Sequence, residues 1–205
     1  MSSQSEIGEM YNRMGKKYLE DIEHSGPPEI EGFMNLLPPG ASILDVGCAG
    51  GRDCKVFAKR GFKVTGVDVS DVFLKEAAER IPQGDFHNAD LRTLTFPANS
   101  FDAIWANAVL LHVPKEEIPL ALTNLYRVLK PGGKLHIRVK KGEGSERITE
   151  VLKNTGEVSR TFTFFEQEEL EKFVTDAGFT LLSSEYLPDD LGRSDVAWIK
   201  VWAEK

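Results

Sequence analysis

The segment SILDVGCAGGRD, residues 42–53, is an apolar run that ends in an acid and a cluster of glycines. This pattern predicts a buried β-strand that turns sharply into a helix, because glycine adopts backbone conformations that other residues avoid. The helix N-terminus after such a turn carries free N–H groups and partial positive charge, which suit a carboxylate or a phosphate. We therefore expect the backbone of this turn to contact a ligand.

A second apolar run, residues 63–69 (KVTGVDV), contains an acid near its end, Asp68, which follows Gly47 at the spacing found in nucleotide-binding folds. At a separation of roughly twenty residues, a second parallel strand presents a carboxylate to the hydroxyls of a ribose. The two strand ends together predict a cofactor that contains a nucleoside.

The glycine positions indicate which cofactor. A dinucleotide fingerprint needs glycine at its first, third and sixth positions, and counting from Gly47 the third is Ala49 and the sixth is Arg52. A phosphate-binding P-loop needs Gly-Lys-Ser/Thr at the start of the helix, which is missing here. The pattern argues against both classes.

The order acid-x-Gly-x-small-x-Gly, filled by Asp45, Gly47, Ala49 and Gly51, resembles motif I of the class I S-adenosylmethionine (SAM) methyltransferases. The resemblance implies that this loop, Cys48 included, binds the cofactor and that Asp45 receives its ammonium group directly or through water. Ala49 departs from the glycine of many members, but it adds only a methyl group.

The resemblance extends along nearly the whole chain. It implies a ribose site at Asp68 and Val69, an adenine site at Asp90 and Leu91, and a cofactor contact at Asn107 after the fourth strand. The most specific later matches are residues 110–114 (LLHVP) and 125–133 (LYRVLKPGG).

Apolar runs alternate with helical patterns, which predicts an α/β fold with a parallel sheet and helices on both faces. The resemblance implies a Rossmann-like sheet of seven strands in the order 3-2-1-4-5-7-6, with strand seven reversed. We expect strands near 42–47, 63–69, 84–89, 101–107, 133–141, 179–187 and 195–203, and helices near 8–24, 29–37, 51–60, 71–80, 115–129 and 166–177.

One domain is expected over residues 1–205, with an N-terminal helical lid (1–40) and a catalytic core (41–205). The polar, glycine-bearing segment 142–159 is interpreted as a mobile loop or lid.

Five further side chains are candidates for the site, each with a structural alternative. Tyr11 and Tyr18 share one helix face and either pack on the domain or, as the resemblance implies, cover the cofactor. His112 is the candidate general base and acceptor contact, or else a histidine bonded to a carbonyl. Arg138 either steers an anionic acceptor or pairs with an acid, and Phe164 either lines the acceptor pocket or belongs to the core.

The composition indicates which classes of binding partner the protein has. The 205 residues carry a net charge of −7, are 41% hydrophobic and include no apolar run long enough for a membrane span. Nucleic acid is therefore an unfavoured partner, and a small-molecule methyl acceptor is expected. The four histidines and two cysteines lack metal-ligand spacing, so we expect no metal site and free thiols at Cys48 and Cys54.

The polar N-terminus and the free thiols favour the cytoplasm, and the expected assembly is a monomer or a homodimer. The expected function is SAM-dependent methyl transfer to an O, N or S nucleophile. The first alternative is a catalytically silent SAM-binding domain, and the second is a tRNA or protein methyltransferase.

Overall fold

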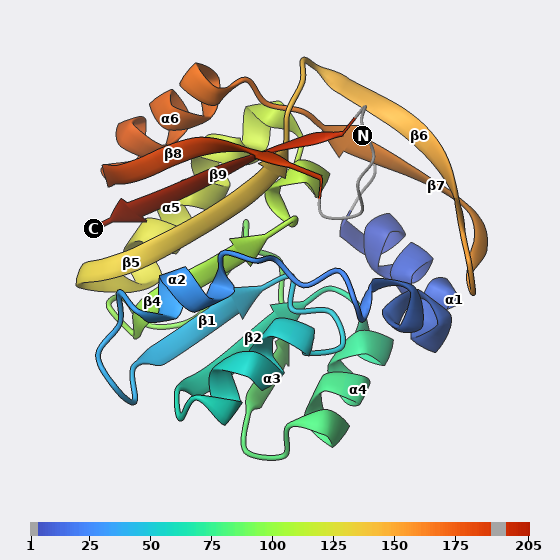
Figure 1. The fold of residues 1–205 in the computed structure, drawn as a ribbon, viewed down its shortest axis with the longest axis horizontal. Coiled ribbons are helices and arrows are strands. Elements are labelled where there is room, and N and C mark those ends of the chain that lie inside the picture. The colour runs from blue at the N-terminus through green and yellow to red at the C-terminus, as the bar shows by residue number, and fades with distance from the viewer. Residues whose placement is uncertain (1–3, 190–195) are drawn as a thin grey trace.

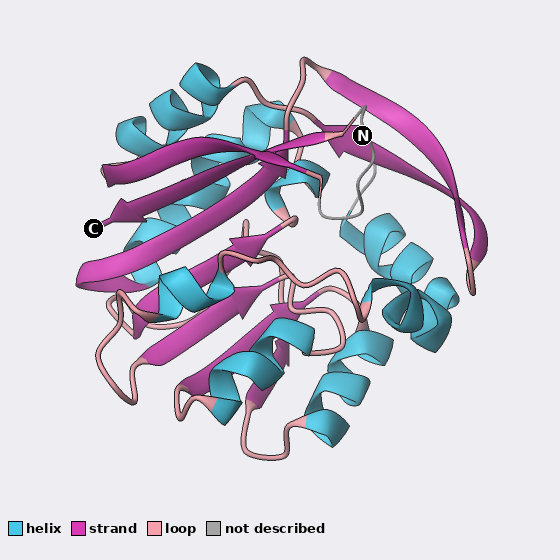
Figure 2. Cartoon of the chain, in the orientation of Figure 1, coloured by secondary structure: helices cyan, strands magenta, loops and turns pink. Residues whose placement is uncertain are grey.

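The computed structural model describes residues 4–189 and 196–205, and it contains a seven-stranded sheet with helices on both faces (Figures 1 and 2). The strand order is β3-β2-β1-β4-β5-β9-β8. The strands are β1 (Ser42–Val46), β2 (Lys63–Asp68), β3 (Asp85–Asn88), β4 (Phe101–Asn107), β5 (Leu129–Lys140), β8 (Thr180–Pro188) and β9 (Ala197–Glu204).

The first five strands of this sheet are parallel, β9 is antiparallel to β5, and β8 is antiparallel to β9. The expected order with one reversed strand is confirmed, with β9 in the place of strand seven and β8 in that of strand six. The expected strand 195–203 corresponds to β9, although its first residue, 195, lies outside the described residues.

Helices form because apolar residues recur on one side of each, and they begin and end close to the expected positions. The helices are α1 (Gln4–Ile22), α2 (Ile30–Met34), α3 (Arg52–Lys59), α4 (Asp71–Arg80), α5 (Ile118–Val128) and α6 (Gln167–Asp176), with short 3-10 turns η1 (Leu110–His112) and η2 (Lys115–Glu117).

Each face of the sheet has its own core. Neighbouring residues of β1 point to opposite faces, so Ile43 packs with Phe57 of α3 while Leu44 packs with Leu125 of α5. This alternation holds the carboxyl ends of β1, β2 and β4 at one rigid edge of the sheet.

The segment 142–159, expected to be a mobile loop or lid, is mostly β-strand. Residues 145–163 form an antiparallel hairpin of β6 (Ser145–Leu152) and β7 (Gly156–Thr163), a separate two-stranded sheet. Its strands, SERITEVL and GEVSRTFT, carry many charged and polar residues and show no regular apolar alternation, so the sequence does not mark them as strands. The turn is completed by Gly156, whose φ of 87° favours glycine.

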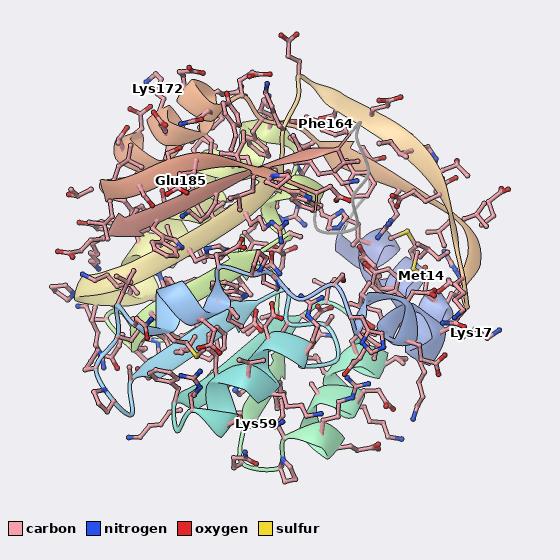
Figure 3. All side chains as sticks on the ribbon, viewed as in Figure 1. Met14, Lys17, Lys59, Phe164, Lys172 and Glu185 are labelled. Carbon is pink, nitrogen blue, oxygen red and sulfur yellow. The ribbon has the colours of Figure 1, made fainter. Side chains whose placement is uncertain are left out.

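Helix α1 lies across the strand edge, packed on α4 and beside the hairpin (Figure 1). The backbone leaves helical geometry at Gly15, where φ is 56° and ψ is −146°. Met14 faces inward and is buried, whereas Lys17 lies at the outer edge of the molecule (Figure 3). The buried side of α1 joins Phe73 of α4 and Val158 of β7 in one small apolar cluster.

A search of the described residues for helices long and apolar enough to cross a membrane found none.

Candidate active site

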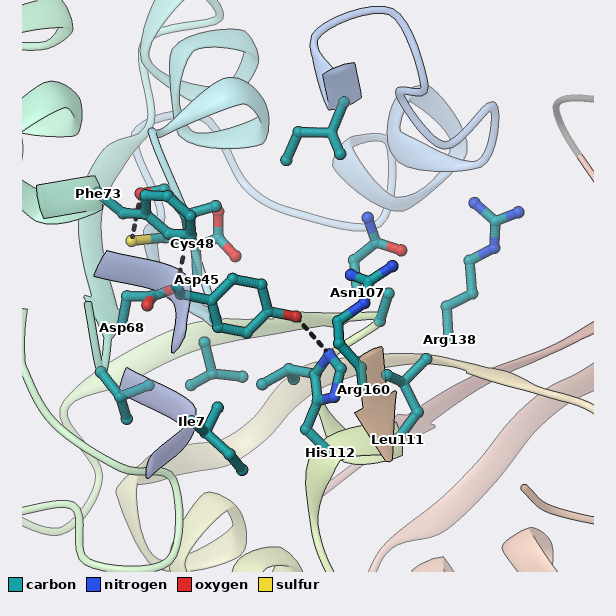
Figure 4. Close-up of a pocket in the computed structure, with 18 of the residues that line it drawn as sticks. Ile7, Asp45, Cys48, Asp68, Phe73, Asn107, Leu111, His112, Arg138 and Arg160 are labelled. Atoms are coloured by element: carbon teal, nitrogen blue, oxygen red, sulfur yellow. Dashed lines mark hydrogen bonds between the residues drawn. The ribbon is translucent and has the colours of Figure 1, made fainter. Parts of the chain in front are cut away.

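A cavity of about 290 Å³ lies at the carboxyl ends of the central strands (Figure 4). Its floor is the loop after β1 with the ends of β2 and β4, and its cover comes from α1 and the hairpin. Open α/β sheets bind ligands at this edge.

The loop after β1 is shaped by close backbone approaches. The N–H groups of Gly47 and Cys48 both donate to the Val67 carbonyl, at 2.8 and 3.0 Å, which holds the loop against β2. A Cβ at Gly47 would lie 2.7 Å from the Val109 side chain, so only glycine fits there. Cys48 and Ala49 line the cavity.

Gly51 allows the turn into α3 and does not line the cavity. It has a φ of 77° and stands just before α3, against Ala77 and Ile81 of the α4 region. Among the residues expected to bind the cofactor, Gly51 is outside the lining of the cavity.

Asp68 lines the cavity and also braces the loop. Its carboxylate accepts the backbone N–H groups of Ala49 (3.0 Å) and Ser70 (2.9 Å), and burial raises its pKa to about 6. Each oxygen retains lone-pair capacity for a ligand hydroxyl. Asp68 can therefore hold the loop and bind a ligand hydroxyl at the same time.

Asp45 lies deeper, 3% exposed, and accepts the Cys54 thiol at 3.1 Å. Burial, with the neighbouring charge of Asp53, raises its pKa to about 8. A ligand cation at Asp45 would offset this cost of ionisation.

Asn107 offers an acceptor to the same cavity. Its amide nitrogen donates to Asp53 at 3.1 Å, and its buried Oδ1 has no hydrogen-bond partner among the described atoms. The oxygens of Asp45 and Asn107 suit the ammonium of SAM, and that of Asp68 suits its ribose, so this end of the cavity fits the cofactor.

The wall near β3 is mostly apolar. Val69 and Leu91 line it together with Ala89, as an adenine ring requires. Asp90 also lines the cavity, but Arg92 donates to its carboxylate through the backbone N–H (2.7 Å), Nε (2.8 Å) and Nη2 (2.6 Å). The sequence did not suggest this pairing.

Tyr11 and His112 form a buried pair at the cavity wall. The Tyr11 hydroxyl lies 2.9 Å from His112 Nε2 (Figure 4). The phenol donates to Nε2 in the tautomer of the neutral ring that carries its proton on Nδ1. Burial, and then the charge of Arg160, lower the pKa of His112 to about 3, so its ring is neutral at neutral pH.

A polar and aromatic group comes from β5 and the hairpin, and the sequence missed two of its members, Glu150 and Arg160. Lys140, Glu150, Arg160 and Phe162 all line the cavity. Arg160 donates to the Tyr18 hydroxyl at 3.0 Å and pairs with Glu150. Arg160 and Phe162 share one face of β7 by their two-residue spacing, a signal that becomes readable once the segment is taken as a strand.

Arg138 lines the cavity, lies 3.5 Å from the Glu29 carboxylate through its Nε, and stacks on Trp198 with its guanidinium carbon 4.5 Å from the ring centroid. Phe164 is outside the cavity lining and lies against Gly142. Phe162, two residues earlier in the sequence, lines the cavity instead.

The described residues contain no group of three or more His, Cys, Asp or Glu side chains that could hold a metal ion.

Comparisons with known proteins point to one family. A profile for the methyltransferase domain matches residues 43–133. The 2-methyl-6-phytyl-1,4-hydroquinone methyltransferase of Synechocystis sp. is 39% identical over 50% of this chain and 33% of its own length. Phosphoethanolamine N-methyltransferase 1 of Zea mays is 32% identical over 73% of this chain and 30% of its own length. The chain thus spans about a third of the length of these relatives.

Solved structures share the fold. A SAM-dependent methyltransferase of Methanosarcina mazei has a TM-score of 0.75 at 23% identity, covering 88% of this chain and 98% of that one. The 1,6-didemethyltoxoflavin-N1-methyltransferase of Burkholderia thailandensis, solved with S-adenosylhomocysteine (SAH), has a TM-score of 0.76 at 22% identity, covering 98% of this chain and 86% of that one.

The domain match, the sheet order and the glycine loop agree with one another. Residues 43–133 match the methyltransferase domain, and the fold is that of the class I SAM-dependent methyltransferases.

Proposed function

We propose that this protein transfers the methyl group of SAM to an O, N or S nucleophile of a small-molecule acceptor. The observation that carries the proposal is a single cavity that joins the glycine loop and strand-end acids to the buried Tyr11–His112 pair. Cofactor and acceptor can therefore occupy one enclosed space.

When bound, SAM would supply a methyl group attached to a sulfonium sulfur. The thioether of SAH is a good leaving group and needs no activation by the protein. The residues of this chain bind the cofactor, exclude water and position the acceptor. Asp45, Asn107 and Asp68 hold the cofactor end, while α1 and the hairpin exclude water. Holding nucleophile and methyl group in attack geometry is worth up to about 7–11 kcal/mol, so a strong side-chain base is dispensable.

The neutral state of His112 suits this environment. A cationic imidazole beside a sulfonium would repel it, whereas a neutral ring orients the Tyr11 hydroxyl without adding charge. We assign His112 a positioning role through Tyr11.

The relatives support a small acceptor, since their names describe methylation of a hydroquinone, of phosphoethanolamine and of trans-aconitate. A catalytically silent SAM-binding domain and a tRNA or protein methyltransferase are the rival functions. A cytoplasmic location and a monomeric or homodimeric state belong to this proposal, and the two free, buried cysteines agree with a reducing compartment.

The test uses SAM labelled in its methyl group and a cell extract divided into small-molecule and macromolecular fractions. Label in a small-molecule product, lost with Asp68→Ala, would support the proposal. Label confined to RNA or protein would contradict the acceptor class. SAH binding without label in any fraction would favour the silent domain.

A further inference from the structure

We propose that Asp53 is a positioning residue for the cofactor. It holds the Asn107 amide with its oxygen toward the cavity, where that oxygen receives the ammonium group of SAM. This inference rests on the proposed function and specifies how the amino end of the cofactor is recognised. It depends on the hydrogen bonds that fix which atom of the amide faces the cavity.

Asp53 lies in the first turn of α3 and is 6% exposed. Its Oδ2 accepts the Trp105 indole N–H at 2.9 Å and the Asn107 amide nitrogen at 3.1 Å. Trp105 and Asn107 are two residues apart in β4, so both point to the face of the sheet on which α3 packs. One oxygen of Asp53 therefore receives donors from two side chains of β4.

The chemistry of Asp53 decides which way the amide points. Arg52 donates to both of its oxygens, through Nε at 2.7 Å and through Nη2 at 3.2 Å. A carboxylate with these partners only accepts hydrogen bonds, whereas an amide has a donating end and an accepting end. Turning the Asn107 amide over would bring its oxygen against the Asp53 oxygen, and the two would repel each other. Asp53 therefore draws Nδ2 toward α3 and leaves Oδ1 for the cavity.

The amide oxygen left in this way lacks a partner. Asn107 lines the cavity, and its Oδ1 is buried and makes no hydrogen bond to the described atoms. An unpaired buried acceptor destabilises a protein, and a donor brought by a ligand removes that cost. The Asn107 oxygen therefore suits a ligand that donates a hydrogen bond.

The neighbouring side chains favour a cationic donor at this place. Asp45 also lines the cavity (Figure 4), and in the parallel pairing of β1 with β4 it lies opposite Trp105, two residues before Asn107. An ammonium has three donors, which a carboxylate and an amide oxygen can share. Asp68, which fits the ribose, comes from β2 on the other side of β1. The β4 side is therefore left to the amino end of the cofactor.

A purely structural role for Asp53 is the competing assignment. An acid in the first turn of a helix is stabilised by the helix dipole. Arg52, the partner of Asp53, also donates through Nη1 to the carbonyls of Ile22 (3.0 Å) and Ser25 (3.2 Å) at the end of α1. A structural role predicts that loss of Asp53 weakens every ligand of the cavity alike. A positioning role predicts a loss confined to ligands that carry the amino group.

The experiment measures, by calorimetry, the affinities for SAH and for deamino-SAH, the analogue in which hydrogen replaces the amino group. Wild type should prefer SAH. Asp53→Asn offers a donor to the Asn107 oxygen and so allows the amide to turn over. It should weaken SAH binding by about tenfold or more and change deamino-SAH binding little.

An exchange variant and a surface variant are the controls. Asp53→Asn combined with Asn107→Asp should restore most of the preference for SAH, because it returns an oxygen to the cavity at the same net charge. Asp176→Asn, which changes an exposed acid on α6, should behave as wild type does. Should Asp53→Asn alone not fold, the exchange variant is compared with Asn107→Leu, and only the exchange variant should keep the preference for SAH.

The proposal is overturned if Asp53→Asn binds SAH as wild type does, if it loses SAH and deamino-SAH equally, or if the exchange variant does not regain the preference. Wild type that binds neither ligand would contradict the cofactor assignment, on which both proposals rest. SAH binding without methyl transfer would refute the catalytic function alone and leave the role of Asp53 standing.

Discussion

The charge state of a single side chain, His112, separates two mechanisms. Its pKa of about 3 follows first from burial and then from the nearby Arg160. Since this value is below the ordinary pKa of about 6.5, the protonated ring is disfavoured, and the imidazole stays neutral from pH 6 to 9. Such a ring is a weak base, but it is a stable acceptor for the Tyr11 hydroxyl.

The first prediction is that the pH dependence of the methylation rate near pH 6.5, measured with an acceptor found as above, is the same in His112→Ala as in wild type, because His112 does not ionise in this range. His112→Ala and Tyr11→Phe should each raise the acceptor KM, and their effects should not add, because the two side chains act as one hydrogen-bonded pair. A wild-type rate that falls below pH 6.5, with the fall abolished in His112→Ala, would instead establish a general base.

Among individual residues, the sequence predicted the position of those that belong to a local motif. Asp45, Gly47 and Asp68 sit where a strand meets a turn, and their geometry follows from a few neighbouring residues. Arg160 could not be found in this way. Its place in the cavity depends on a hairpin that packs beside α1, where Arg160 contacts Tyr18, more than a hundred residues away in sequence.

Among the elements, α1 and the hairpin depend on each other. Asp21 of α1 accepts hydrogen bonds from the turn of the hairpin, at 2.9 and 3.0 Å from Asn154 and at 3.1 and 2.7 Å from Thr155. Burial alone would raise the pKa of Asp21, but these hydrogen bonds lower it. The depressed pKa means that the contact is stable above pH 4 and weakens as the carboxylate is protonated below it.

The second prediction is that Asp21→Ala loosens the cover of the cavity. The amides of residues 150–158 should exchange hydrogen faster, and SAH should dissociate several-fold faster, while the sheet keeps its protection. Asp176→Ala on α6 is the control, because that acid pairs only with exposed Lys172 among the described residues. Unchanged exchange in the hairpin would show that Asp21 does not hold it.

The sequence located α1 but misjudged the hairpin. The helical spacing of Tyr11, Met14 and Tyr18 is a strong signal, because one buried face repeats over several turns. The hairpin has little burial of its own, so its strands show no clear apolar alternation and were taken for a loop.

For the molecule as a whole, the central strands β1 and β4 were the most predictable feature, because they are mostly buried on both faces of the sheet and are rich in apolar residues. His136 in β5 is an exception to this apolar character. It is completely buried, stacked on Trp105 with ring centroids 3.7 Å apart, and its Nδ1 accepts the Trp202 indole N–H at 3.0 Å. Burial, with the charges of Arg138 and Lys200, holds its pKa well below the usual value.

The third prediction concerns acid stability. A lowered folded-state pKa means that His136 contributes fully above pH 6.5 and loses its contribution as the unfolded chain takes up the proton below that pH. The unfolding free-energy advantage of wild type over His136→Gln, measured in urea, should therefore shrink by about 1.4 kcal/mol per pH unit below 6.5. A pH-independent difference would mean that the folded protein also protonates His136.

The central claim is that SAM binds where the glycine loop meets the ends of β1 and β2, and calorimetric titration with SAH tests it most directly. Wild type should bind SAH, and Asp68→Ala should weaken binding by roughly ten- to a hundredfold, as the loss of a charged hydrogen-bond acceptor of ~1.5–3 kcal/mol implies. Asp176→Ala should bind as wild type does. Equal SAH affinity in wild type and Asp68→Ala, or no binding by wild type, would contradict the account.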